Sequence, residues 1–136
     1  RMITIKPKSF NSENIDPAEY NKDYIIMINP LIETSGNKIE WIEECLSLPS
    51  THGKVQRFET VTVTYMNING ETKKLVANWP LSGALQHEID HLEGILYINR
   101  QDKKKTFGTL KRLRSARRKN MIKQRKLRKQ INTDVQ

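Results

Sequence analysis

The segment LQHEIDHLEG (85–94) constrains this chain more than any other feature, because it places two histidines four residues apart with a glutamate beside the first. On an α-helix, residues four apart lie one above the other, so His87 and His91 can share one metal ion. Glu88 then lies about 100° round the helix, where its carboxylate can take a proton from water activated by that ion. Two histidines that only fill the core are the alternative. The spacing of this HExxH pattern favours a metal site.

A third ligand is needed, because a catalytic metal site usually combines three protein ligands with one open position. No histidine follows His91, and the carboxylates beyond it are badly placed. Upstream, the segment EECLSLPS (43–50) contains Cys45, the single cysteine of the chain. A free cysteine is more often a small buried hydrophobe. Beside two histidines at ligand spacing, however, we expect Cys45 to be the third ligand.

Short strand-like runs precede the HExxH segment. Residues 2–6 and 24–28 are rich in β-branched side chains, and residues 61–68 alternate Val and Tyr with Thr. Asn69-Gly70 follows, before another run at 71–77. An Asn-Gly pair between two such runs predicts a β-hairpin.

The helix itself is predicted from Pro80 to Gly94. Proline suits a first helical position, and glycine suits the end of a helix. One apolar stripe with helical spacing supports this prediction: Leu81, Leu85, Ile89 and Leu92. The apolar run ILYI (95–98) predicts a short strand after the helix.

A basic tail ends the chain. Residues 103–130 hold 14 of the 24 Lys and Arg residues and no acidic residue, so the rest of the chain is net acidic. We predict an α+β domain at 1–102, with a mostly antiparallel sheet packed around a central metal-binding HExxH helix. Residues 103–136 are predicted to form a basic C-terminal helix or tail. No run approaches the ~20 apolar residues that a membrane span needs. The apolar stripe of the tail is thin, which disfavours a membrane surface, so no membrane partner is expected.

Two motifs resemble those of a known family. EECLSLP (43–49) and LQHEIDHLEGILYI (85–98) look like the second and third motifs of the peptide deformylases, and the resemblance runs over residues 2–100. Deformylases are metal-dependent hydrolases that remove the N-formyl group from the N-terminal methionine of new polypeptides. The resemblance implies that one divalent ion binds to Cys45, His87 and His91. This ion is commonly Fe²⁺ in the family, with Zn²⁺, Ni²⁺ or Co²⁺ as substitutes. It also implies that Glu88 is the general base and later protonates the leaving amine.

The resemblance implies roles for three further residues. The backbone N–H of Leu46 would hold the developing oxyanion. Gly83 and Ala84 match positions that line the methionine pocket. A glycine inside a helix costs about 1 kcal/mol against alanine, so room for a ligand is one reason for Gly83, and close helix–sheet packing is the other.

The sequence departs from the family at two places. The first motif, a glycine-rich segment ending in a glutamine that shares the oxyanion, is not found in the sequence. Glu44 stands where the family usually has glycine, and it would be strained if that position needs positive φ. We interpret the chain as a fragment of a longer enzyme. A natural short form and a degenerate relative that binds metal without catalysis are the alternatives.

The density of cations in the tail suits phosphate backbones without sequence preference. In some bacterial deformylases a basic C-terminal helix is thought to dock on the ribosome. The resemblance thus implies nascent N-formyl-Met peptides as substrates and ribosomal RNA as a partner, through Lys111, Arg112, Arg114, Arg117 and Arg118. A solvated or disordered tail is the simpler reading.

We expect a monomer in the bacterial cytoplasm, although an organelle matrix fits equally well. The alternative function is a catalytically impaired deformylase-like protein that binds ribosomes or RNA through its basic tail.

Overall fold

The fold comes from a computed structural model of the chain and is described for residues 1–6, 10, 23–101 and 108–109. Four strands form an antiparallel sheet in the order β1-β2-β3-β4. Their bounds are β1 Met2–Ile5, β2 Ile25–Cys45, β3 Leu48–Met66 and β4 Thr72–Asn78. Two helices follow, α2 Leu81–Leu92 and α3 Tyr97–Arg100, and a short strand β5, Gly108–Thr109, pairs with β3.

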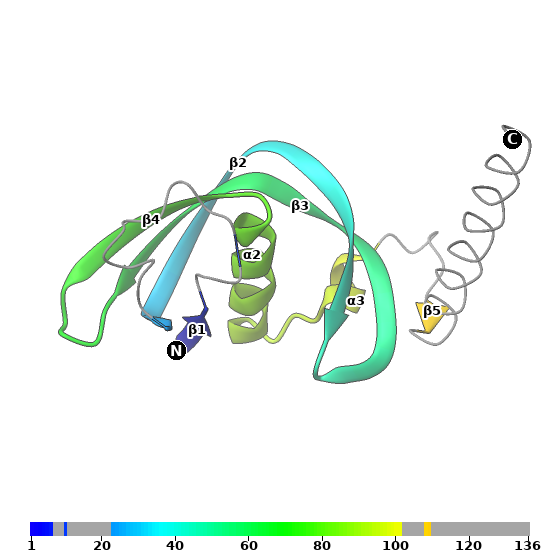
Figure 1. The fold of residues 1–136 in the computed structure, drawn as a ribbon, viewed down its shortest axis with the longest axis horizontal. Helices are drawn as coiled ribbons and strands as arrows, with labels where there is room; N and C mark the ends of the chain where they lie inside the picture. Colours follow the sequence, from blue (N-terminus) through cyan, green and yellow to red (C-terminus); the bar gives the residue numbers. More distant parts are fainter. Residues whose placement is uncertain (7–9, 11–22, 102–107, 110–136) are drawn as a thin grey trace, which may run out of the picture.

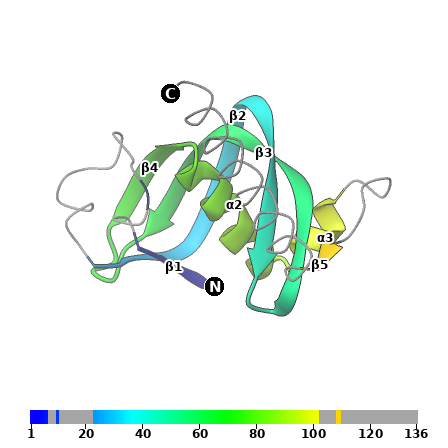
Figure 2. The same cartoon turned by 45° about the vertical axis from the view of Figure 1, so that its right-hand side comes forward.

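Strands β2 and β3 form a long curved hairpin that arches over α2 and reaches α3 (Figures 1 and 2). Register shifts between Ser35 and Lys38, and near both ends of β2, bend this ribbon. From the sequence we predicted only the start of β2, near 24–28, and the end of β3, near 61–68. Much of the remainder lacks the strict apolar alternation that marks a half-buried strand, so it was not recognised.

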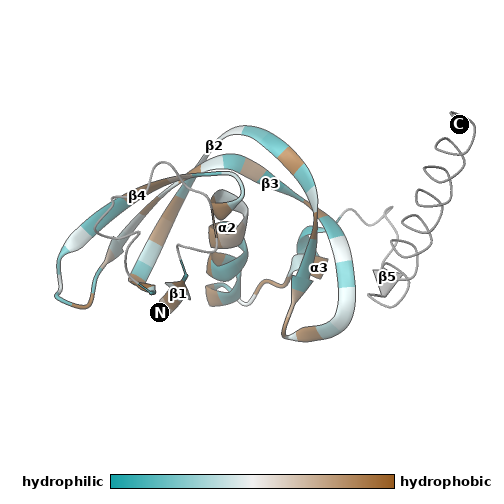
Figure 3. Cartoon of the chain, viewed as in Figure 1, coloured by the Kyte–Doolittle hydropathy of each residue, from teal (hydrophilic) through white to brown (hydrophobic). Residues whose placement is uncertain are grey.

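The core lies between the inner face of the sheet and α2. Alternate residues in the second half of β3 are buried, and Figure 3 shows bands of different hydropathy along the β2–β3 ribbon. Leu81 and Leu85 are fully buried, and burial of each such side chain contributes roughly 2 kcal/mol. The predicted helical stripe is therefore confirmed. The core cluster consists of Ile3, Ile5, Ile25, Met27, Val61, Val63, Tyr65, Leu75, Ala77, Leu81, Leu85 and Ile89.

Two turn predictions are confirmed with small differences in their bounds. Pro80 is the N-cap of α2 rather than its first residue, and Gly94, with φ of 71°, follows the C-cap Glu93. The β3–β4 hairpin contains the Asn69-Gly70 pair, with Gly70 at φ of 80°. Its loop is longer than two residues because the side chain of Asn67 accepts hydrogen bonds from two backbone N–H groups of the loop.

The prediction of a strand at 95–98 is wrong. The backbone turns into α3 at Tyr97, whose buried ring packs against Gly53 of β3 and whose hydroxyl lies 2.7 Å from the hydroxyl of Thr51. Asn99 stabilises the turn, because its side chain accepts a hydrogen bond from the N–H of Leu96. A four-residue apolar run does not distinguish a strand from a buried helical turn.

The α+β class and the antiparallel sheet are confirmed. Within the predicted basic tail only residues 108–109 are described, and they form a strand rather than helix; the rest of 103–136 lies outside the described residues. Among the described helices, none combines the length and the apolar character required to cross a membrane.

Candidate metal centre

The structure brings together the three side chains that the sequence analysis selected as ligands. One potential ligand atom from each of Cys45, His87 and His91 lies within 4.8 Å of the others. His91 Nε2 lies 3.3 Å from Cys45 Sγ and 3.2 Å from His87 Nε2. Cys45 comes from the end of β2, and both histidines come from α2. All three are half-buried.

The end of β2 matches α2 in spacing. Residues 43 and 45 point to the same face of the strand, and two strand residues span about 6.6 Å. Four helical residues span about 6.0 Å, so the step from His87 to His91 nearly equals the step from Glu43 to Cys45. Each helix histidine therefore meets one strand side chain.

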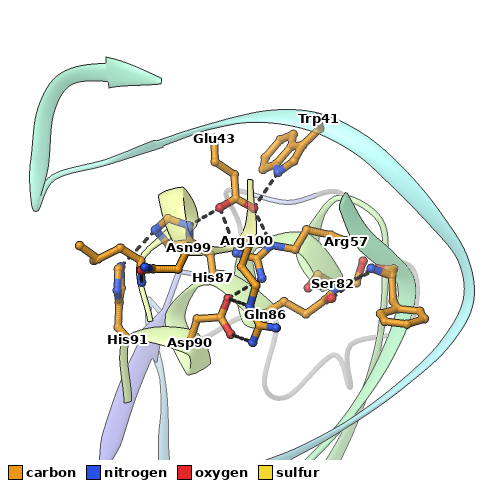
Figure 4. Close-up of polar contacts among 12 residues, drawn as sticks. Trp41, Glu43, Arg57, Ser82, Gln86, His87, Asp90, His91, Asn99 and Arg100 are labelled. Carbon is orange, nitrogen blue, oxygen red and sulfur yellow. Dashed lines mark hydrogen bonds and ion pairs between the residues drawn. The ribbon is translucent and has the colours of Figure 1, made fainter. Parts of the chain in front are cut away.

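Glu43 is the partner of His87. Its Oε2 lies 2.7 Å from His87 Nδ1 and accepts a hydrogen bond from Arg57 Nη2 at 3.0 Å. Its Oε1 accepts from Arg57 Nε at 2.7 Å and from Trp41 Nε1 at 3.0 Å. Figure 4 shows this carboxylate between the three donors. Because Nδ1 of His87 is engaged, its Nε2 faces Cys45 and His91, the orientation that a metal-ligating histidine needs.

These contacts shift three pKa values. Burial acts to raise the pKa of Glu43, but hydrogen bonds from His87 and Arg57 outweigh it and lower this pKa to about 2. The hydrogen bond with Glu43 raises the pKa of His87 to about 9 against the opposing effect of burial. Burial also acts to raise the pKa of Cys45, but hydrogen bonds from Ser47 and His87 lower it overall. A thiolate is thereby favoured at the position where a metal ligand is expected.

A buried ion network continues behind the histidines. Oδ2 of Asp90, on α2, accepts a hydrogen bond from Arg57 Nη1 at 2.5 Å. Oδ1 of the same carboxylate accepts one from Arg100 Nη2 at 2.6 Å. Glu43, Arg57 and Asp90 are all below 10% exposed. Burial would lower the pKa of Arg57, but its hydrogen bonds to Glu43 and Asp90 raise it overall. The network joins β2, β3, α2 and α3 and holds the helix in place under the arch.

This network was not predicted from the sequence. The position of Glu43, two residues before Cys45 on a strand, was a usable signal, because such residues share a face. Arg57 and Arg100 carried no comparable signal, since their contact with Asp90 depends on how β3 and α3 pack on α2.

The remaining predicted residues are placed as follows. Leu46 lies in the turn between β2 and β3 and is fully exposed, and Glu88 and Ala84 are half-buried on α2. Gly83 has a packing reason, because an added Cβ would lie 2.7 Å from the ring of Trp79. Their catalytic and substrate-binding roles stay predictions. The five tail residues expected to contact RNA lie outside the described residues.

Glu44 does not carry the backbone strain that the sequence analysis considered. Among the described residues other than glycine, positive φ occurs only at Asn29 and Ser50. Glu44 is exposed, and its neighbour Glu43 carries the buried contacts. A side chain at position 44 is therefore compatible with this backbone.

The donor set fits a first-row divalent ion. One thiolate and two imidazoles suit iron, zinc, cobalt or nickel better than magnesium or calcium, which prefer oxygen ligands. Three protein ligands also leave a position open, as in catalytic sites. The second-layer carboxylate at His87 is a usual companion of such ligands.

Comparisons with known proteins point to one family. A family model described as polypeptide deformylase matches residues 1–107. The peptide deformylase of Helicobacter hepaticus is 38% identical over 85 residues, covering 62% of this chain and 47% of that protein. The peptide deformylase of Endomicrobium trichonymphae is 44% identical over 86 residues, covering 63% of this chain and 50% of that protein.

A solved structure agrees with these sequence matches. A peptide deformylase from Plasmodium falciparum aligns with a TM-score of 0.61 and 35% identity, covering 76% of this chain and 56% of that one. This chain thus spans about half the length of the curated relatives it matches.

Proposed function

Because the chain belongs to the polypeptide deformylase family, we propose that it is all or part of a metal-dependent hydrolase that removes the N-formyl group from the N-terminal methionine of newly made polypeptides. The observation that carries this proposal is the grouping of Cys45 Sγ with the imidazoles of His87 and His91. Cys45 and the histidines are far apart in sequence, and one cysteine with two histidines is a ligand set that catalytic metal sites use.

The three side chains would hold one divalent ion, and we propose Fe²⁺, with Zn²⁺, Ni²⁺ or Co²⁺ as substitutes. When bound, such an ion polarises a carbonyl oxygen and lowers the pKa of water towards neutrality. Glu43 would keep His87 in the tautomer that leaves Nε2 free for the ion. The raised pKa of His87 means that a proton must leave this imidazole when the ion binds.

Glu88 would handle the proton in the reaction. Its carboxylate accepts a proton from the attacking water and delivers it to the leaving amine nitrogen, as the formyl C–N bond breaks to give formate and a free amine. The backbone N–H of Leu46 would donate to the oxyanion on the former carbonyl oxygen. The turn that carries Leu46 directly follows the ligand Cys45, which supports this role.

The test is formate release from an N-formyl-methionyl peptide, with the 136-residue protein purified without oxygen and Glu88→Ala as control. We expect release by the native protein and at least a hundredfold loss in the control. A metal analysis of both proteins should show about one ion per chain. Metal-loaded protein that releases no formate would contradict the proposed activity and favour the non-catalytic alternative.

We also propose N-formyl-Met nascent peptides as the substrates, ribosomal RNA as a partner, and the bacterial cytoplasm as the location. The proposed substrates follow from membership of the family. The RNA partner is supported by the density of Lys and Arg in residues 103–130, around Lys111, Arg112, Arg114, Arg117 and Arg118. Binding to ribosomes that weakens steeply with rising salt, and is lost when these five residues are replaced by Gln, is the expected result.

A further inference from the structure

A chain of ion pairs leads from the molecular surface to one of the candidate metal ligands. Its outer end is Arg100 of α3, whose side chain is 47% exposed. Asp90, Arg57 and Glu43 follow in that order, and all three are buried. Glu43 then contacts Nδ1 of His87 at 2.7 Å. Figure 4 shows these contacts as one continuous path from α3 to the imidazole.

Two links of this path consist of paired hydrogen bonds. Arg100 donates to Asp90 from Nε at 3.1 Å and from Nη2 at 2.6 Å, each to a different carboxylate oxygen. Arg57 donates to Glu43 in the same way, from Nε at 2.7 Å and from Nη2 at 3.0 Å. Two parallel bonds between a guanidinium and a carboxylate fix their relative orientation as well as their distance.

Asp90 joins the two paired links. Its Oδ2 accepts from Arg57 Nη1 at 2.5 Å and from Arg100 Nε at 3.1 Å. Because Asp90 holds Nη1 of Arg57, the opposite edge of that guanidinium faces Glu43. Without Arg100, one of the two groups that fix the plane of the Asp90 carboxylate is lost, and Arg57 is held less firmly. Arg100 therefore influences the orientation of Glu43 without touching it.

The short helix α3 places Arg100 on this path. Tyr97, its first residue, is buried and packs against Gly53 of β3. Arg100 is three residues later, so the two side chains lie on the same side of the helical turn. Asn99 closes the turn by accepting a hydrogen bond from the N–H of Leu96. An extended strand at these positions would turn Arg100 to the face opposite Tyr97.

We propose that Arg100 is a positioning residue for the metal centre, because it holds Asp90 and Arg57 and thereby fixes Glu43 against His87. The inference rests on the metal centre of the proposed function. The competing explanation is that Arg100 and Asp90 form only a partly exposed ion pair, which contributes little to the protein. The two explanations differ in what they predict for metal affinity.

The Zn²⁺ affinity of the full chain, measured by competition with a chelating indicator, tests the proposal. Arg100→Met should lower this affinity about three- to tenfold. That loss is smaller than the 10- to 100-fold typical of a residue that contacts a ligand directly, because Arg100 acts through three others. Arg100→Lys keeps the charge and the ion pair but cannot form the paired hydrogen bonds, so it should restore only part of the affinity.

Lys73→Met is the matched control. It breaks the ion pair between Lys73 and Glu71, whose lysine side chain is 42% exposed, and it should bind Zn²⁺ like the native protein. Circular dichroism shows whether each variant is folded at the titration temperature. Arg100→Lys keeps the test valid if Arg100→Met does not fold, because it too should bind Zn²⁺ more weakly than the native protein.

A double-mutant cycle separates positioning from a general loss of structure. If Arg100 acts through Glu43, adding Arg100→Met to Glu43→Gln should lower the Zn²⁺ affinity by less than about twofold, because the path is already broken. An effect on the fold as a whole would instead add to that of Glu43→Gln in full.

The inference and the proposed function fail in different ways. Native Zn²⁺ affinity in the Arg100 variants, or fully additive losses in the cycle, would overturn the inference and leave the function standing. Zn²⁺-loaded protein that releases no formate would contradict the function without affecting the inference. A native chain that does not bind Zn²⁺ would overturn both.

Discussion

The carboxylate of Glu43 and the imidazole of His87 form a partly buried contact, with Oε2 2.7 Å from Nδ1. The exposed side-chain fraction is 2% for Glu43 and 12% for His87. Glu43 belongs to a strand and His87 to a helix, and the two are 44 positions apart. The contact orients the nitrogen of His87 that faces Cys45 and His91. We therefore expect Glu43 to orient one of the candidate ligands of the metal centre.

Replacing Glu43 should weaken metal binding without removing a ligand. We expect Glu43→Gln to lower the Zn²⁺ affinity about 10- to 100-fold, because the orienting acceptor of His87 is lost. A competition titration against a chelating indicator measures the affinity. The matched control is Glu44→Gln, which changes the neighbouring, exposed carboxylate and should bind Zn²⁺ like the native protein. Equal affinities of the two variants would contradict the orienting role.

The Arg57 network should contribute strongly to stability. Arg57→Met removes the common partner of Glu43 and Asp90 and leaves two buried carboxylates without it, at a cost of about 3–5 kcal/mol in the free energy of unfolding. Urea denaturation measures this loss. Lys54→Met breaks an ion pair whose lysine side chain is 53% exposed and should cost at most about 1 kcal/mol. Similar losses in both variants would contradict the assignment.

The metal-free protein should lose stability between about pH 6.5 and 9. Because the folded pKa of His87 is raised from 6.5 to about 9, its contribution is complete below pH 6.5 and disappears as the pH rises through 9. The lowered pKa of Glu43 places the acid-side loss between about pH 4.5 and 2. The loss at alkaline pH is on the order of 2 kcal/mol.

Urea denaturation of chelator-treated protein across this pH range measures the effect, with a maximum expected between pH 4.5 and 6.5. In Glu43→Gln the loss between pH 6.5 and 9 should shrink, because the partner that raises the pKa of His87 is gone. A native profile that stays flat up to pH 9 would exclude the pairing.

Metal binding should depend on pH in the opposite sense. Since the ion needs a neutral imidazole and a thiolate, protons leave His87 and Cys45 when it binds. We expect the apparent Zn²⁺ affinity to rise from pH 6 to pH 9. The binding enthalpy measured by calorimetry should vary with the ionisation enthalpy of the buffer, because the buffer takes up the released protons. An affinity independent of pH over this range would be inconsistent with the raised pKa of His87.

Restoring the family's usual glycine at position 44 should not improve the protein. Glu44 is not at positive φ, so Glu44→Gly relieves no strain and should cost about 0.5–1 kcal/mol through the added chain entropy. Gly94→Ala is the contrasting variant, because Gly94 has φ of 71° and alanine there is strained. Thermal unfolding of both variants checks the prediction. A clear gain in stability from Glu44→Gly would reverse our interpretation of this position.

The sequence alone indicated the HExxH helix, the hairpin at Asn69-Gly70 and the three candidate ligands, which the fold brings together. The helix around the HExxH pattern, its apolar stripe and its glycine end follow from a period of 3.6 residues and from the backbone freedom of glycine, which are properties of the chain itself. The placement of the two candidate histidine ligands on one helix face follows from their spacing alone. The β-hairpin at Asn69-Gly70 was also predictable, because the backbone freedom of glycine favours a turn at this pair.

Only the tertiary structure decided what surrounds the ligands. Cys45 reaches His91, and Glu43 reaches His87, because β2 crosses α2 in one register, and a slip of one residue would turn both side chains away. The meeting of Arg57 with Asp90 and of Trp79 with Trp41 likewise depends on the curvature of a long hairpin. Strand partners are chosen over long sequence distances, so the contacts of Arg57 and Trp79 depend on packing rather than on a local pattern. Among the residues around the ligands, Glu43 alone carried a local signal, its position two residues before Cys45.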